Sequence, residues 1–303
     1  MNTPDKPVVS VIIPTYNSAK TLPTLLVSIK KQTYRNIEII VVDRYSEDDT
    51  VRLASKFGAH VLQAETERAQ AKNIGLSNAK GKYVLFLDSD MELTPTVVQE
   101  CVNVAERDHT VAAVVIPEIT TGNSLVARIR RYERYWYQNT YVESPRFYRR
   151  DLALQAGGFD PTVIFYEEAT LAYKLEKMGY RKARIKSYIL HHEENLSLKD
   201  LLRKRYYYGK SLSTYSAKYR DYATLQLNPG YRLRLFLRKE FWQQPHMAIA
   251  VLTLKSLEYL VTYIASSNSA NAKRLFLHRQ PPFRQTWKTH CLKNAENTAE
   301  ESK

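Results

Sequence analysis

Cysteine and glycine are scarce in this chain of 303 residues, which has 2 Cys, 9 Gly and 12 Pro. The two cysteines, Cys101 and Cys291, are too few and too far apart for a disulfide framework or a thiolate zinc site. We therefore expect a reducing compartment. The low glycine and proline content also excludes a collagen-like or low-complexity chain.

The first residues, MNTPDKPVV, lack a basic segment followed by a long apolar run, so no secretory signal peptide is predicted. We expect the protein in the cytoplasm, peripheral on the cytoplasmic face of a membrane. Hydrophobic residues make up 44% of the chain and charged residues 25%, which is typical of a globular protein. Disorder throughout the chain is therefore excluded.

Acidic residues are few in the C-terminal part of the chain. Residues 1–180 contain 22 basic and 22 acidic side chains, whereas residues 181–303 contain 23 basic and 9 acidic ones. The whole net charge of +14 therefore belongs to the second segment. This asymmetry predicts an anionic partner, for which lipid headgroups, a diphosphate substrate and nucleic acid are the candidates.

Short apolar runs alternate with helical patterns over residues 8–116. Such alternation predicts an α/β fold: a Rossmann-like, mostly parallel sheet with helices on both faces. We expect strands at 8–14, 37–42, 60–62, 82–87 and 111–116, and helices at 21–32, 48–57, 67–79 and 94–105.

The pattern changes after residue 117 and becomes richer in arginine and tyrosine. We expect a catalytic domain over residues 1–230 and a basic, amphipathic helical region over residues 231–303. The later elements expected are helices at 125–137, 168–178, 197–219 and 247–265 and strands at 146–148 and 184–190.

Polar groups follow three of the predicted strands, at the edge where parallel sheets bind ligands. They are Pro14-Thr15-Tyr16-Asn17, Asp43 and Asp88-Ser89-Asp90. No GxGxxG or GxxxxGK[ST] motif follows the first strand, so neither a dinucleotide fingerprint nor a P-loop is predicted. Two carboxylates one residue apart can share Mg²⁺ or Mn²⁺, which prefer oxygen ligands. The alternative is a solvated acidic turn.

Taken in order, these motifs resemble the inverting glycosyltransferases of family 2, which have the GT-A fold. The resemblance covers about residues 8–210. It is carried by PTYN at 14–17, VVDxxSxDxT at 41–50, AxNxGxxxAxGxYxxFLDxD at 71–90, RFYRR at 146–150, GGFD at 157–160, FYEE at 165–168 and GY at 179–180.

The resemblance implies a nucleotide-sugar donor and a divalent metal ion. The nucleoside would be held by Thr15, Tyr16 and Asp43, with Pro14, Asn17 and Ser89 beside them. Lys72 and Asn73 would lie near the diphosphate. Asp88 would contact ribose or metal, and Asp90 would ligate Mg²⁺ or Mn²⁺ and neutralise the leaving diphosphate. His191 would be a third metal or diphosphate ligand.

The catalytic base is expected in the pair Glu167-Glu168, which matches the family's Glu-Asp pair. We assign Glu168, the second member, as the group that takes the proton from the acceptor hydroxyl. The family usually has Asp at this position and often another carboxylate where this chain has Thr170. Which of the two glutamates acts therefore stays open, and the alternative reading of both is an acidic helix N-terminus.

Basic residues follow the matched region. Arg203 and Arg205 could hold the donor diphosphate or lipid headgroups. The (Q/R)xxRW motif of processive family members is missing, which favours the addition of one sugar.

The segment 247–265 is long enough, at about 19 residues, to cross a bilayer. Lys255 and Glu258 lie near its middle. Each would raise the free energy of membrane insertion by roughly 2.5–3.5 kcal/mol, whereas each aliphatic residue lowers it by only about 0.3–0.6 kcal/mol. With Thr262 they form a polar stripe, so we expect an amphipathic helix in the membrane interface. The alternative is a helix docked on the catalytic domain. Cations that suit anionic lipids flank it at Arg232, Arg234, Arg238, Lys239, Lys273, Arg274, Arg279 and Arg284.

The expected function is therefore metal-dependent, inverting transfer of one sugar from a UDP- or GDP-sugar to an acceptor hydroxyl or phosphate. We expect this acceptor to be a lipid or lipid-linked glycan at an anionic membrane surface. Homo-oligomers are compatible with the sequence. A sugar nucleotidyltransferase ranks lower, because its Gly-rich, Arg-containing loop is missing. A non-enzymatic protein that binds membrane or nucleic acid would leave the carboxylates at the strand ends unexplained, so no nucleic-acid partner is expected.

Overall fold

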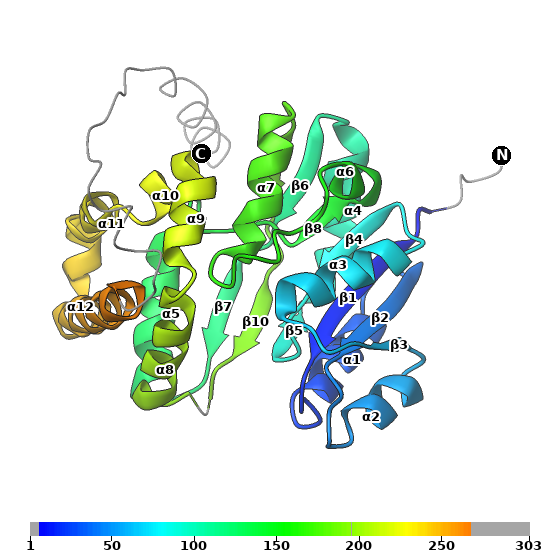
Figure 1. Ribbon diagram of the computed structural model, residues 1–303, viewed down its shortest axis with the longest axis horizontal. Helices are drawn as coiled ribbons and strands as arrows, with labels where there is room; N and C mark the ends of the chain where they lie inside the picture. Colours follow the sequence, from blue (N-terminus) through cyan, green and yellow to red (C-terminus); the bar gives the residue numbers. More distant parts are fainter. Residues whose placement is uncertain (1–5, 195, 268–303) are drawn as a thin grey trace, which may run out of the picture.

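The computed structural model (Figure 1) describes residues 6–194 and 196–267 and contains a seven-stranded sheet. The strand order is β3-β2-β1-β4-β8-β6-β9. All neighbours are parallel except β8, which runs antiparallel to both β4 and β6. The strands are β1 (Val9–Thr15), β2 (Ile37–Asp43), β3 (His60–Gln63), β4 (Tyr83–Phe86), β6 (Val111–Val115), β8 (Phe147–Arg149) and β9 (Arg181–Arg184).

Helices cover both faces of this sheet, as the apolar strands predicted. Val11 and Ile13 of β1 pack into one core, whereas Ile12 between them packs into the other. The first core is closed by α1 (Leu22–Lys30), α2 (Thr50–Lys56) and α4 (Val97–Arg107), and the second by α3 (Arg68–Asn78), α6 (Arg150–Gln155) and α7 (Glu167–Lys177).

A second, three-stranded sheet was not predicted from the sequence. Its order is β5-β10-β7, formed by β5 (Met91–Leu93), β10 (Ile189–His192) and β7 (Glu118–Thr121). The expected strand 184–190 is instead two strands, because β9 ends at Arg184 and β10 begins at Ile189. His191 pairs with Met91 of β5 and Thr120 of β7, so this sheet brings His191 next to the Asp88–Asp90 loop.

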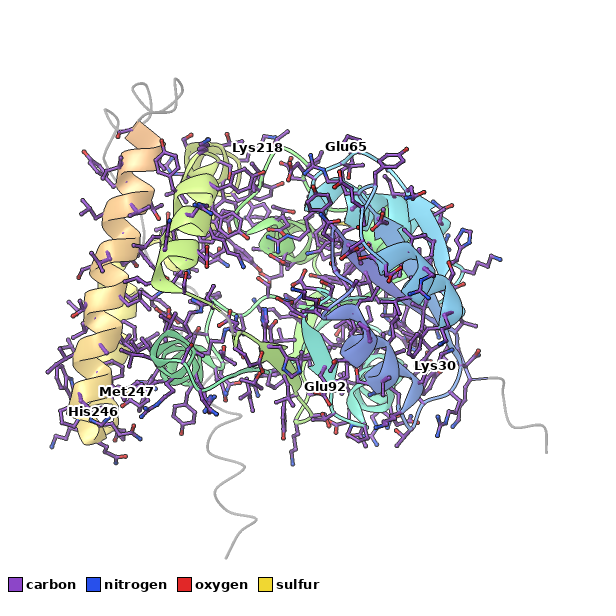
Figure 2. The ribbon with its side chains drawn as sticks, turned by 90° about the horizontal axis from the view of Figure 1, so that it is seen from below. Lys30, Glu65, Glu92, Lys218, His246 and Met247 are labelled. Atoms are coloured by element: carbon purple, nitrogen blue, oxygen red, sulfur yellow. The ribbon has the colours of Figure 1, made fainter. Side chains whose placement is uncertain are left out.

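The C-terminal helices form a third apolar core with α5 (Leu125–Tyr137), in which Ile129, Leu201, Phe241 and Val251 pack together. Figures 1 and 2 show α12 along an outer edge of the molecule, and Figure 2 labels His246 and Met247 at its start. Besides α5, this third core is formed by α8 (Leu198–Gly209), α11 (Pro229–Phe236), the 3₁₀ helix η1 (Lys239–Gln243) and α12 (Pro245–Ser267).

The long helix expected over 197–219 is broken after α8. The chain continues as α9 (Leu212–Lys218) and α10 (Arg220–Gln226). At the break, the Ser211 hydroxyl accepts hydrogen bonds from the backbone N–H groups of Ile164 and Phe165, each at 3.2 Å. Just before it, a Cβ on Gly209 would lie 2.7 Å from Ala265, so glycine allows α8 to approach α12 closely.

The polar stripe of α12 faces the protein, so on this side the helix is docked on the rest of the chain, the arrangement given above as the alternative. Lys255 and Glu258 are each only 5% exposed, against α5 and α8, whereas Leu260 and Tyr263 on the opposite side are 56% and 61% exposed. In the described part of the chain, α12 alone has the length and mean hydropathy of a membrane span. Lys273, Arg274, Arg279, Arg284 and the side chain of Arg232 lie outside the described residues.

Candidate active site

A cleft of about 610 Å³ opens at the carboxyl ends of β1 and β4 and extends to the C-terminal helices. Predicted site residues line it on the sheet side, and α5, α8 and α12 line its far side. The predicted site residues that line the cleft are Pro14, Thr15, Tyr16, Asp88, Ser89, Asp90, Glu167, Glu168, His191 and, from α8 on the far side, Arg205.

Asp43 and Asn17 hold two loops together rather than line the cleft. The buried Asp43 carboxylate accepts hydrogen bonds from the Thr15 hydroxyl at 2.8 Å and from the backbone and hydroxyl of Ser46. Asn17, at φ +46°, donates its backbone N–H to the Ser46 hydroxyl and accepts from the N–H of Glu47. These contacts keep the exposed Tyr16 ring at the edge of the cleft.

Asp88 lies among cations that the sequence did not reveal. Its carboxylate is 3.3 Å from the Arg146 guanidinium and 3.8 Å from that of Arg68. Burial alone would raise the pKa of Asp88, but the charges of Arg146, Lys72 and Arg68 outweigh burial and hold it well below its usual range. Asp88 is therefore ionised at neutral pH. The neighbouring Ser89 hydroxyl donates to that of Ser18 at 3.1 Å.

Asp90 and His191 form a pair whose chemistry fits a divalent metal ion. The Asp90 Oδ2 atom lies 3.4 Å from His191 Nε2, and Asp90 Oδ1 is buried with no hydrogen-bond partner. Within residues 6–194 and 196–267, no three His, Cys, Asp or Glu side chains are grouped to hold a metal by themselves. A metal bound here would therefore need further ligands from a substrate or water. His192 instead contacts Glu92 and Glu194.

Glu167 and Glu168 stand at the first turn of α7 beside two cations. Glu168 Oε1 is 3.0 Å from Lys72 Nζ, and Glu167 Oε1 is 2.6 Å from Arg68 Nε. The side chain of Glu168 is 20% exposed and that of Glu167 only 2%. An acceptor can therefore reach Glu168 more readily.

The two carboxyl groups also differ in pKa. Burial and the neighbouring charge of Glu168 raise the pKa of Glu167 to about 7. Burial acts in the same direction on Glu168, but the charges of Lys72, Arg68 and Arg146 outweigh it and lower its pKa to about 2. Glu167 has the pKa better matched to proton transfer near neutral pH, and Glu168 has the better access. We give access the greater weight, because a base must first reach the proton it removes.

Lys72 and Asn73 do not line the cleft surface, and their expected place near the diphosphate stays a prediction. Lys72 is fully buried between the two glutamates and the Phe159 ring. The Asn73 amide donates to the carbonyl of Phe159 and accepts from its N–H, each at 2.8 Å. Gly158, at φ +63°, makes this possible, because a Cβ there would lie 2.4 Å from Asn73 Oδ1. Asn73 therefore anchors the 157–160 turn.

Arg203 and Arg205, two residues apart on α8, point to different places. Arg205 lines the cleft, 3.2 Å from Glu258 and over the Phe165 ring. The Arg203 side chain is 73% exposed and lies outside this cleft. It does not reach the donor side, contrary to one of its two expected roles.

A chain of ion pairs links α12 to His191 and was missed from the sequence. Lys255 of α12 is 2.5 Å from Glu133, and Arg130 contacts both Glu133 and Glu193. Arg134 joins Glu193 to Glu118, which is 3.4 Å from His191. The i, i+4 spacing of Arg130 and Arg134 on the helix predicted at 125–137 was the one local signal. Their partners come from distant segments.

Comparison with known proteins places the chain in a family. Residues 10–165, more than half of the sequence, match the model of glycosyl transferase family 2. The chain is 44% identical over 89 residues to the glycosyltransferase GlyG of Streptococcus pneumoniae, which covers 27% of this chain and 30% of GlyG. It is 34% identical over 109 residues to the poly(ribitol-phosphate) beta-N-acetylglucosaminyltransferase TarS of Staphylococcus aureus. This match covers 33% of this chain and 19% of TarS. These matches span a third or less of the relatives' length.

Solved structures share the fold over most of the chain. S. aureus TarS 1-349 in complex with UDP-GlcNAc has a TM-score of 0.54 at 20% identity, covering 88% of this chain and 89% of TarS 1-349. The mannosyltransferase PcManGT from Pyrobaculum calidifontis, in complex with GDP-Man and Mn²⁺, has a TM-score of 0.56 at 24% identity, covering 89% and 79%. Together with the family match over residues 10–165, this shared architecture means that the chain belongs to glycosyltransferase family 2 and is a glycosyltransferase with the GT-A fold.

Proposed function

We propose that the protein transfers one sugar from a UDP- or GDP-sugar to an acceptor hydroxyl or phosphate, with inversion at the anomeric carbon. The observation that carries the proposal is that Tyr16, Asp90 and Glu168 line one continuous cleft. The ligands named for the two solved structures, UDP-GlcNAc and GDP-Man, support a nucleotide-sugar donor.

The donor end of the cleft lies at β1. The exposed ring of Tyr16 offers a face on which a base can stack, and Thr15 is held in place by Asp43. Mg²⁺ or Mn²⁺ would be held by Asp90 and His191, with Asp88 alongside. When bound, the ion would neutralise charge on the departing nucleoside diphosphate. The unpaired Asp90 Oδ1 supports this assignment.

Glu168 is the proposed base. It is ionised at neutral pH, and its contact with Lys72 fixes the direction of its carboxylate. It accepts the proton as the acceptor oxygen attacks the anomeric carbon on the side opposite the diphosphate. Arg68 and Lys72 balance the charges of the two glutamates, so that both can be held side by side.

The acceptor is proposed to be a lipid or lipid-linked glycan at the cytoplasmic face of a membrane. The exposed apolar face of α12, with Leu260 and Tyr263, supports insertion into the interface. The exposed cations Arg234, Arg238 and Lys239 precede α12 and suit anionic headgroups. Because Lys255 and Glu258 pair with the rest of the protein, we propose that α12 lies on the membrane rather than spans it.

The division into a catalytic domain, 1–230, and a membrane-associated region, 231–303, remains a proposal. Lys255 lines the catalytic cleft from beyond that boundary. The two parts are therefore proposed to differ in role while sharing one packed interface.

The proposed function is tested by donor hydrolysis with a panel of UDP- and GDP-sugars, with and without Mn²⁺. We expect one donor to be hydrolysed in a Mn²⁺-dependent manner, and Asp90→Asn to abolish both this hydrolysis and Mn²⁺ binding measured by electron paramagnetic resonance with the nucleotide present. Glu92→Gln is the matched control, since Glu92 contacts His192 outside the cleft. A folded protein that neither binds nor hydrolyses any sugar nucleotide would overturn the proposal.

A further inference from the structure

A second pocket, of about 420 Å³, adjoins the catalytic cleft between the start of α3 and α8. Glu67, Arg68, Glu167, Lys204 and Tyr208 line both cavities. The second pocket therefore opens beside the pair of glutamates that contains the proposed base. None of the residues predicted to bind the donor at the ends of β1, β2 and β4 lines it.

The walls of this pocket are mainly apolar. The apolar lining is made by Ala69, Pro161, Val163 and Ile164 together with Tyr207 and Tyr208, and Glu67 also lines the pocket. Tyr208 is held rigidly, because its ring stacks on Phe165 with centroids 5.3 Å apart and its hydroxyl accepts a hydrogen bond from Arg68. A preformed apolar wall of this kind binds alkyl or prenyl groups without further ordering.

Two cations belong to the same pocket. The Arg203 side chain is largely exposed, and its carboxylate neighbour, Asp200, is at 4.0 Å, the outer limit of an ion pair. Lys204 is exposed, and no ion pair to it is found among the residues that the structure describes. An apolar pocket with two solvated cations matches a ligand that joins a hydrocarbon chain to a phosphate.

We propose that this pocket binds the acceptor as an amphiphilic phosphate, with the hydrocarbon chain against Val163, Ile164 and Tyr207 and the phosphate at Arg203 and Lys204. This inference rests on the proposed function, because it makes the pocket the acceptor side of the same reaction. Glu167, the neighbour of the proposed base Glu168, lines the same pocket, so an acceptor held here lies beside the catalytic pair. In a free lipid phosphate the attacking atom is a phosphate oxygen, and in a lipid-linked glycan it is a sugar hydroxyl. The phosphate can belong to a free lipid phosphate or to a lipid-linked glycan.

The test uses the full chain and titrates octyl phosphate, octanol and inorganic phosphate by isothermal titration calorimetry. We expect octyl phosphate to bind at least about tenfold more tightly than either partial ligand, because only octyl phosphate engages both the cations and the apolar wall. The double variant Arg203→Ala/Lys204→Ala should weaken octyl phosphate binding by about tenfold or more. Arg220→Ala, which removes an exposed cation outside the pocket, is the matched control.

A second variant tests the apolar wall independently. Ile164→Trp fills the pocket and should weaken octyl phosphate binding while leaving binding of inorganic phosphate unchanged. If octyl phosphate bound instead to the exposed face of α12, Leu260→Ser/Tyr263→Ser would weaken it and Arg203→Ala/Lys204→Ala would not. That result, or equal binding of octyl phosphate by the cation variant and the control, would overturn the inference.

Octyl glucosyl diphosphate, in which a diphosphate joins the octyl chain to glucose, distinguishes the two sources of the ligand when it replaces octyl phosphate. Tighter binding of the diphosphate glycoside would identify a lipid-linked glycan, and tighter binding of octyl phosphate a free lipid phosphate. Donor hydrolysis is measured on the same preparations. Its presence with no octyl phosphate binding would overturn the pocket assignment alone, and its absence would overturn the proposed function itself.

Discussion

Glu167 and Glu168 are neighbours in sequence, yet the fold gives them different surroundings. We expect Glu168→Gln to lower kcat by at least ~10²-fold, the effect typical of losing a general base, with donor affinity retained. Glu167→Gln should lower kcat less, because the Glu167 carboxyl is almost fully buried. Steady-state kinetics and donor titration of both variants check this. An inactive Glu167→Gln beside an active Glu168→Gln would reverse the assignment.

The raised pKa of Glu167 predicts a pH effect on stability. Its folded-state pKa of about 7 lies above the ordinary value of 4.5, so the folded protein favours the protonated carboxyl. The stability that this proton contributes is complete below 4.5 and is lost as the pH rises through 7. Glu167→Gln cannot ionise, so its Tm relative to the parent protein should increase over this range. Parallel Tm curves for the two proteins would contradict the prediction.

At the scale of the element, α12 is stabilised by contacts on its charged face. Lys255→Met removes the cation nearest to Glu133 and Glu258, which keep only the more distant Arg130 and Arg205, and should lower the free energy of unfolding by at most about 3–5 kcal/mol. Leu260→Ser, on the exposed face of the same helix, should change it by less than about 0.5 kcal/mol. Urea denaturation followed by circular dichroism measures both. Similar losses in the two variants would show that the ion pairs do not stabilise the helix.

Secondary structure with a strong local pattern was predictable, and structure imposed by distant contacts was not. The apolar run at 37–42 predicted β2, and the helix expected at 125–137 agrees with α5. By contrast, β5 and β7 have only three and four residues and exist because β10 lies between them. The break between α8 and α9 depends on Ser211 binding the backbone of residues 164 and 165, which no periodicity reveals.

The same distinction applies to the candidate site. Asp88 and Asp90 were predictable because they follow an apolar strand directly. The role of Asn73 as an anchor of the 157–160 turn was not, because it depends on the Phe159 backbone, more than eighty residues away. Arg68 likewise becomes a site residue only when α3 packs beside α7 and places its guanidinium against Glu167. The sequence therefore indicated the edge of the sheet used for catalysis, and the fold supplied the surrounding charges.

At the scale of the whole molecule, the proposal of membrane association makes a prediction about vesicles. The protein should cosediment with anionic liposomes, with part of the binding lost as salt screens the basic residues. Leu260→Asp/Tyr263→Asp should remove most of the salt-resistant part, because it places two charges on the exposed apolar face. Donor hydrolysis by this variant should match that of the parent protein. If this variant bound liposomes in high salt as well as the parent protein does, the proposed role of α12 would be contradicted.

These surface variants are a better test than deletion of residues 231–303. Deletion would remove Lys255 from Glu133 and would uncover Ile129 and Leu201, which pack against the C-terminal helices. A truncated chain that failed to bind liposomes could therefore have failed to fold. Only variants on the outer face of α12 separate the two causes.

The inward orientation of Lys255 and Glu258 also limits how modular the chain is. A chimera that kept residues 1–230 and took its remaining helices from another glycosyltransferase would present Glu133 and Arg205 to a foreign surface. Such an exchange would succeed only if the complementary charges were transferred with the new helix. The C-terminal segment therefore cannot be exchanged independently of the rest of the chain. We expect substitutions in it to be accompanied by substitutions in α5 and α8.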